Sequence, residues 1–279
     1  MPAINDITRQ KIKAYLEVFI ENKVEEYKNR EIPVFDETAA YLVKQSKQGR
    51  LKPFHAAIIP ESIMRINAFE RGFSTTLGTT FEECARLIAL EHHQCAERGY
   101  DLTGSVSQAA INEIEHQVLF YDRGVQGEPT RPTLFQMITK VLAARKADDL
   151  TERTVRADLY IRTHKGEELF FEIKSPKPNK GQCLEITQRL LRFHLLRGKN
   201  QPAVRAYFAM AYNPYGPDRA SYHWAIPQKY MPFDSTVVIA QDFWTLIGGP
   251  TTYPELIGIY RTVGKEKSKY IIDALSFGF

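Results

Sequence analysis

The stretch RADLYIRTHKGEELFFEIKSPKPNKGQ, residues 156–182, decides the fold of this chain. Residues 155–162 and 168–174 alternate apolar and polar side chains, and a His164-Lys165-Gly166 turn signal separates them. Alternation with period two on both sides of a glycine turn predicts a β-hairpin. Two prolines follow the second run and end it, because proline cannot donate a hydrogen bond to a sheet.

The second predicted strand carries an acid and a base two residues apart, at Glu172 and Lys174. Alternate side chains of a strand share a face, so these two groups lie together, and hairpin pairing places Asp158 on the same face. Two neighbouring carboxylates repel each other, and a divalent cation such as Mg²⁺ removes that conflict.

This set of side chains suits phosphodiester hydrolysis. A metal held by Asp158 and Glu172 lowers the pKa of a bound water and neutralises charge on a phosphate. Lys174 either orients that water or stabilises the developing charge, and the pattern leaves both roles open. The alternative reading is a solvated hairpin face with an ordinary cross-strand ion pair.

The composition narrows the class of protein. The chain has 279 residues, of which 43% are hydrophobic and 25% charged, as in ordinary globular domains. It contains no apolar run of about 18 residues and no apolar signal core at its start, so we expect no membrane association. Three scattered cysteines predict a reduced, cytoplasmic protein. The net charge of +4 permits nucleic-acid binding without requiring it.

Periodicity predicts the remaining elements. Helices are expected at residues 5–30, 36–47, 61–71, from Gly78 to a stop at Gly99, and at 107–121, 133–146, 181–197 and within 241–275, with connections at 52–60 and 124–132. Further strands are expected at 203–212, 222–226 and 236–240. The order predicts an α/β fold with a mixed β-sheet flanked by helices, and helical N- and C-terminal additions.

Asp158, followed after a hairpin by Glu172-Ile173-Lys174, resembles the active-site signature of the PD-(D/E)xK nuclease superfamily. Ala157 stands where the literal pattern has proline. The resemblance implies a restriction-endonuclease-like core, Mg²⁺ as cofactor, the Ile173 carbonyl as a further metal ligand, and products with a 5′-phosphate.

Gly78-Thr79-Thr80-Phe81-Glu82 resembles the helix that precedes the core hairpin in many of these nucleases, where a glutamate points at the metal site. The resemblance makes Glu82 a candidate catalytic residue, with Glu83 as the second choice. The alternative is a glutamate that only favours the dipole of its helix.

Three further stretches, FERGFSTTLGTTFEECA, FEIKSPKPNKGQ and FWTLIGGPTTYPEL, resemble type II restriction endonucleases of the TdeIII-like group. That group implies double-strand cleavage at a short palindrome of the GGNCC kind. A palindromic site implies a homodimer on double-stranded DNA. We also expect a cognate DNA methyltransferase that is functionally paired with the enzyme and not bound to it.

A basic stretch after the hairpin is the predicted DNA surface. Cationic side chains there can meet phosphates, and amides can bond base edges. The candidates are Lys177, Asn179, Lys180, Gln182, Arg189 and Arg192, with Arg197 and Lys199 beyond them and Arg205, Tyr212, Asn213 and Tyr215 on the next strand. For any single one of these residues, an ordinary solvated helix surface is the alternative.

We therefore expect a single nuclease domain over 1–279, with helical additions at 1–75 and 241–279 around a catalytic core at 76–240. Two other functions remain open. One is a repair or recombination nuclease with the same core that cuts by DNA structure. The other is a DNA-binding module that does not cleave.

Overall fold

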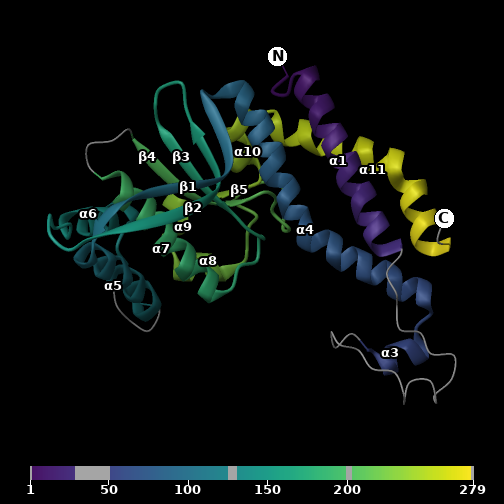
Figure 1. The fold of residues 1–279 in the computed structure, drawn as a ribbon, viewed down its shortest axis with the longest axis horizontal. Coiled ribbons are helices and arrows are strands. Elements are labelled where there is room, and N and C mark those ends of the chain that lie inside the picture. Colours follow the sequence, from purple (N-terminus) through teal and green to yellow (C-terminus); the bar gives the residue numbers. More distant parts are fainter. Residues whose placement is uncertain (1, 29–50, 125–130, 199–202, 278–279) are drawn as a thin grey trace. The chain divides into compact units, whose positions relative to one another are not determined.

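The computed structural model describes residues 2–28, 51–124, 131–198 and 203–277. Within them, five strands form one sheet in the order β1 (Cys95–Ser107), β2 (Leu150–Arg162), β3 (Glu168–Ile173), β4 (Val204–Met210) and β5 (Val237–Ile239) (Figure 1). The first three strands are antiparallel, and β3, β4 and β5 are parallel. The predicted α/β fold with a mixed sheet flanked by helices is confirmed.

The predicted hairpin is β2 and β3. Leu159 lies opposite Phe171 and Tyr160 opposite Phe170. Gly166 closes the turn with a positive φ of 81°, a conformation that costs glycine little, and its N–H donates to the Thr163 carbonyl at 2.9 Å.

The alternation of side chains changes phase at Asp158. Strict alternation puts Tyr160 on the face opposite to Val155 and Ala157, yet all three belong to one core cluster. The β1–β2 ladder has no pair at this point, and Gly99 of β1 takes a φ of 61°. The expected division of β2 into two regular faces is therefore wrong here, because both strands are irregular where Asp158 stands.

One face of the sheet packs against α7 (Lys180–Arg197), which also contacts α5 (Gln108–Gly124), α6 (Leu134–Ala143) and α8 (Ala225–Tyr230). Phe170 of β3 stacks on Phe193 of α7 with 4.5 Å between ring centroids. From the other face, Phe171 meets Phe243 of α10 (Gln241–Gly248) edge-on at 5.7 Å. Helices thus cover both faces of β3, whose six residues are all buried.

Helix α4 (Glu61–His92) runs without interruption through Gly78, so the helix start predicted there is wrong. A single glycine costs a helix about 1 kcal/mol, which the surrounding turns can offset. The stop predicted at Gly99 is also wrong, because α4 ends at His92 and residues 95–107 form β1. Strand β1 was not predicted because apolar and polar residues do not alternate regularly along it.

The strand predicted at 222–226 is wrong. Residues Ala225–Tyr230 form helix α8, and the segment before it is hydrogen-bonded to the loop after β3. Tyr222 donates its hydroxyl hydrogen to the Pro176 carbonyl, and the Trp224 indole donates to that of Pro178. The connection expected at 52–60 contains a short helix, α3 (Pro53–Ile58).

The other predicted elements agree with the structure to within a few residues where it describes them. They include α1 (Asp6–Lys28) and the C-terminal α11 (Thr252–Phe277), whereas the short helix α9 (Phe233–Thr236) before β5 was not predicted. The helix expected at 36–47 and most of the loop at 124–132 lie outside the described residues.

The chain divides into two compact units. The first contains residues 1–8 and 81–256, with the whole sheet, and the second contains residues 9–80 and 257–279. In the second unit the N- and C-terminal helices lie together, and Lys13 of α1 pairs with Glu266 of α11 at 2.8 Å. No helix in the described part of the chain combines the length and apolar character needed to cross a membrane.

Candidate active site

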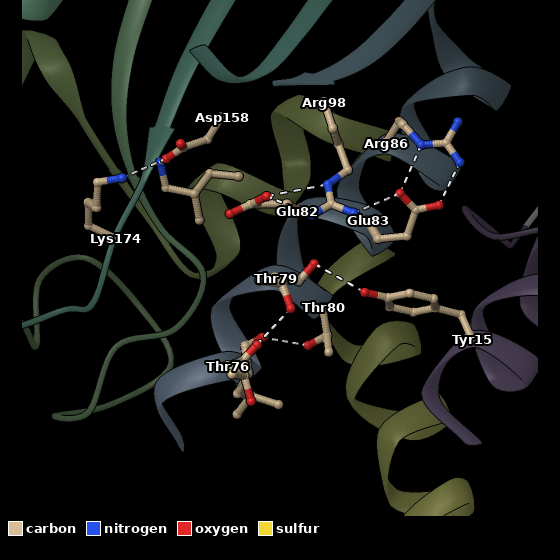
Figure 2. A network of polar contacts seen from close by, with 12 residues as sticks. Tyr15, Thr76, Thr79, Thr80, Glu82, Glu83, Arg86, Arg98, Asp158 and Lys174 are labelled. Atoms are coloured by element: carbon tan, nitrogen blue, oxygen red, sulfur yellow. Dashed lines mark hydrogen bonds and ion pairs between the residues drawn. The ribbon is translucent and has the colours of Figure 1, made fainter. Parts of the chain in front are cut away.

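Asp158, Glu172 and Lys174 meet where β3 ends. The Lys174 ammonium donates to Oδ2 of Asp158 at 2.9 Å and lies 3.4 Å from Oε2 of Glu172 (Figure 2 shows the first pair). The backbone N–H of Ile173 donates to the same Oδ2 at 2.8 Å. The hairpin pattern predicts this meeting of three charged groups, and their catalytic role stays a prediction.

Glu172 is fully buried, and Arg189 of α7 pairs with its carboxylate. Nη1 of Arg189 lies 2.9 Å from both carboxylate oxygens of Glu172. Nη2 of the same arginine donates to Glu185, one turn earlier on the helix, at 3.1 Å. Arg189 was predicted as a phosphate contact from sequence; its present partner is the carboxylate of the candidate metal ligand.

The crowding of the two carboxylates affects the pKa of Glu172. Burial raises the pKa of Glu172, and the charge of Asp158 raises it further, against the lowering effects of Arg189 and Lys174. Burial lowers the pKa of Lys174, but its hydrogen bond to Asp158 and the charges of both acids outweigh that and raise it. Lys174 is therefore an ammonium at neutral pH.

A cavity of about 270 Å³ opens beside Asp158 and is lined by Glu82, Arg98, Gly99, Arg156 and Asp158 itself. Glu82 comes from α4, and its Oε2 accepts from Nη2 of Arg98 at 2.8 Å (Figure 2). Glu83 pairs with Arg86 and Arg98 and is not among the residues that line this cavity. The structure thus brings Glu82, the first of the two candidate glutamates, to the same cavity as Asp158.

Arg98 and Arg156 are two cationic residues of this cavity that the sequence did not single out. Arg98 lies on β1, the strand that was not predicted, so no pattern placed it near the site. Arg156 precedes Asp158 by two residues and is largely exposed. Its guanidinium occupies the space where a side chain at Gly99 would begin.

The predicted DNA contacts have varied surroundings. Asn179 and Gln182 form a capping box at the start of α7, each side-chain oxygen accepting the other's backbone N–H at 2.9 Å. Lys180 pairs with Asp122, and Lys177 lies over the ring of Tyr215, 5.3 Å from its centroid. Exposed Arg192 lines a separate cavity of about 320 Å³. DNA binding by these residues stays a prediction.

Other basic residues of the predicted surface are paired within the protein. Arg197 donates to both oxygens of Glu168, at 2.6 and 2.8 Å, and Arg205 pairs with Glu167 at 3.3 Å. Asn213 is buried and bonds to the loop that follows it, whereas Tyr212 and Tyr215 are exposed. Lys199 lies outside the described residues.

The comparisons with known proteins agree over nearly the whole chain. A family model described as "Type II restriction endonuclease, HinfI" matches residues 4–264. The type II restriction enzymes HgiEI and HgiBI from Herpetosiphon aurantiacus are each 50% identical to this chain over 273 residues, which cover 98% of it and 99% of either relative. HgiCII from the same organism is 49% identical over the same share. No solved structure matches.

A family match over most of the chain and 50% identity from end to end leave one assignment: the chain belongs to the HinfI family of type II restriction endonucleases.

Proposed function

We propose that this protein is a Mg²⁺-dependent endonuclease of the PD-(D/E)xK superfamily that cuts both strands of DNA at a short palindrome and leaves 5′-phosphates. The observation that supports it most is the meeting of Asp158, Glu172 and Lys174 beside a cavity, on a chain of a type II restriction family.

The donor set fits a divalent cation. Two carboxylates crowd each other strongly enough for Asp158 to raise the pKa of Glu172. One or two carboxylates, completed by water and phosphate oxygens, are what Mg²⁺ commonly takes in proteins. The proposed ligands are the carboxylates of Asp158 and Glu172 and, by the resemblance to the superfamily, the Ile173 carbonyl. Among the described residues no group of three or more His, Cys, Asp or Glu side chains forms a metal cluster. When bound, the ion would activate a water and neutralise phosphate charge.

The protein's own side chains divide the remaining work. Lys174 enters as an ammonium and is proposed to stabilise the charge that grows on the phosphoryl oxygens during in-line attack. Asp158 holds that ammonium through its Oδ2 atom. The same oxygen also accepts the backbone N–H of Ile173. Glu82 is proposed to act from the far side of the cavity on a water or on the metal.

For DNA binding we propose the segment that leads into α7, with Lys177, Asn179, Lys180, Gln182 and Arg192 near the duplex. Lys177 and exposed Tyr215 lie together next to the end of β3, where a bound strand would pass. Arg189 is not among these proposed contacts, because it already pairs with Glu172. A palindromic target further implies a homodimer, with each protomer cutting one strand.

The recognition sequence is a separate part of the proposal. The family model that matches is that of HinfI, and the resemblance to the TdeIII-like group, with a site of the GGNCC kind, stays a prediction. A cognate methyltransferase and a cytoplasmic location are proposed on the same grounds. The division into a core at 76–240 with helical additions also stays a proposal.

The test is a digest of long, unmethylated phage DNA by the purified protein, with Mg²⁺ or with EDTA, beside the Glu172→Gln variant. Discrete fragments that need both Mg²⁺ and Glu172 support the proposal, and sequencing their ends gives the site, the cut position and the 5′-phosphate. A Mg²⁺-dependent smear indicates a structure-directed nuclease. Intact DNA under every metal and buffer indicates a module that binds without cutting.

A further inference from the structure

Arg189 forms an ion pair with Glu172, the carboxylate that is proposed to bind the metal. Its Nη1 bridges both oxygens of Glu172 at 2.9 Å, and Glu172 has no exposed surface. Both oxygens of that carboxylate are therefore engaged by a guanidinium, and Lys174 stands 3.4 Å from one of them. A cation that coordinates Glu172 therefore competes with this arginine for the charge and the lone pairs of the carboxylate.

The same arginine already has a second carboxylate partner. Nη2 donates to Oε1 of Glu185 at 3.1 Å, and Glu185 lies four residues before Arg189 on α7, the spacing at which helical side chains meet. The Glu185 side chain is 65% exposed, whereas that of Glu172 is fully buried. Arg189 can thus leave Glu172 by a rotation of its side chain and keep an ion pair.

The charges of the site explain why such a move is needed. Two carboxylates, Asp158 and Glu172, face two cations, Lys174 and Arg189, so the site is balanced without metal. A divalent ion added to that arrangement creates an uncompensated excess of two positive charges in a buried place, which is unfavourable. Transfer of Arg189 to Glu185 removes half of the excess, and an incoming phosphate neutralises the rest.

We propose that Arg189 is a positioning residue that acts as an exchangeable counter-ion: it holds Glu172 in the metal-free enzyme and passes to Glu185 when a divalent cation binds. This inference rests on the proposed function, because it needs Asp158 and Glu172 to be metal ligands. It goes beyond that function in making metal affinity depend on two residues of α7 that do not ligate the metal.

The experiment measures metal binding directly and without DNA. Mn²⁺ is titrated into the full-length protein, and the signal of free Mn²⁺ is followed by electron paramagnetic resonance. The variants are Arg189→Met, Arg189→Lys and Glu185→Gln. Arg123→Met is the matched control, because it removes one positive charge from the exposed surface of the neighbouring helix α5 without touching Glu172.

Arg189→Met is expected to bind Mn²⁺ about tenfold more tightly than wild type, since hydrogen bonds to a charged group no longer have to be broken. Arg189→Lys is expected to fall between them. Glu185→Gln is expected to bind about threefold more weakly, because Arg189 then has no second carboxylate on its helix. The control should keep the wild-type affinity for Mn²⁺.

Two results overturn the inference. Equal or weaker Mn²⁺ binding by Arg189→Met means that the arginine only orients Glu172 for the metal; if that variant does not fold, the same result with Arg189→Lys decides. An unchanged affinity in Glu185→Gln removes the transfer step. Absence of Mn²⁺ binding in wild type and in every variant has a different meaning, since it removes the metal site of the proposed function and the exchange with it.

Discussion

Glu168 and Glu172 stand four residues apart on β3, both buried and both paired with an arginine of α7, but their surroundings differ. Arg197 uses two nitrogens for Glu168, one for each oxygen, and Tyr160 donates a third bond at 2.8 Å. Glu172 receives a single nitrogen of Arg189, shared between its oxygens. No acid stands in contact with Glu168 among these bonds, whereas Asp158 crowds Glu172.

The difference separates a structural ion pair from a candidate reactive one. At Glu168 every partner stabilises the carboxylate, and the stacked rings of Tyr100 and Tyr160, 4.1 Å apart, pack beside it. At Glu172 a second carboxylate, Asp158, raises the pKa, and a cavity opens beside Asp158. Carboxylates that a fold places side by side against their repulsion mark functional sites more often than well-matched pairs do.

Among the variants considered, Glu172→Gln is expected to have the largest effect on the rate of cleavage. We expect cleavage to fall by at least about 10³-fold with little loss of DNA affinity, because the variant removes the charge of a proposed metal ligand. Single-turnover cleavage of plasmid DNA, with a gel-shift measurement in Ca²⁺, checks both parts. A variant that cuts at near the wild-type rate would show that the end of β3 near Glu172 is not the active site.

Lys174→Met tests whether the ammonium matters beyond its ion pair. The expected loss of cleavage is on the order of 10²–10³-fold, as for removal of one donor that stabilises developing charge. Because the pKa of Lys174 is raised, its rate contribution should not titrate below pH 9. A rate that instead rises tenfold per pH unit between pH 6 and 9 in wild type and stays flat in the variant argues for a lysine that accepts a proton.

Glu168→Gln is the matched change at the structural end of the strand. It leaves Arg197 without its counter-charge and weakens three bonds, so the free energy of unfolding should fall by about 2–3 kcal/mol. Urea denaturation measures the loss. The folded variant should retain wild-type cleavage per molecule, and a selective loss of cleavage with unchanged stability would reverse the roles given to the two glutamates.

Glu82→Gln and Glu83→Gln test which of these two glutamates contributes to cleavage. Only Glu82 lines it with Asp158, so we expect about a tenfold loss of cleavage for Glu82→Gln and a much smaller one for Glu83→Gln. Both lose an ion pair with Arg98, which makes each a control for the other. Equal effects in the two variants would reduce Glu82 to a support of β1.

The smallest effect concerns pH and stability. Because the pKa of Glu172 is raised above its ordinary value of 4.5, the metal-free folded state holds this proton more tightly than the unfolded chain does. Wild type therefore loses stability as pH rises from 4.5 through the raised pKa, and Glu172→Gln does not share that loss. In EDTA the melting temperature of the variant should gain on wild type over this window, and Mg²⁺ should reduce the difference.

Much of the candidate site was predictable because it depends on local pattern. Period-two alternation and a glycine turn fix the hairpin, and the hairpin alone brings Asp158 to Glu172 and Lys174. The capping pair Asn179 and Gln182 is likewise local, although it was interpreted as a pair of DNA contacts.

The remainder depends on contacts between distant segments. Strand β1 contains two glycines and lacks alternation, so neither it nor Arg98 could be placed. The partners of Arg189 and Arg197 depend on how α7 lies on the sheet, which helical periodicity does not specify. Gly78 looked like a helix start from composition, but in α4 the packing of neighbouring turns overrides the propensity of one residue.

Arg189 and Arg197 of α7 also fix how this helix is aligned along β3. Eight residues of helix separate Arg189 from Arg197, about 12 Å at 1.5 Å per residue. Four residues of strand separate Glu172 from Glu168, about 13 Å at 3.3 Å per residue. The two repeats coincide at this length, so both ion pairs form in one alignment of helix and strand. A slip of α7 by a single turn, about 5.4 Å, breaks both at once, and the buried pair at Glu168 thereby keeps Arg189 in register with the site it is proposed to serve.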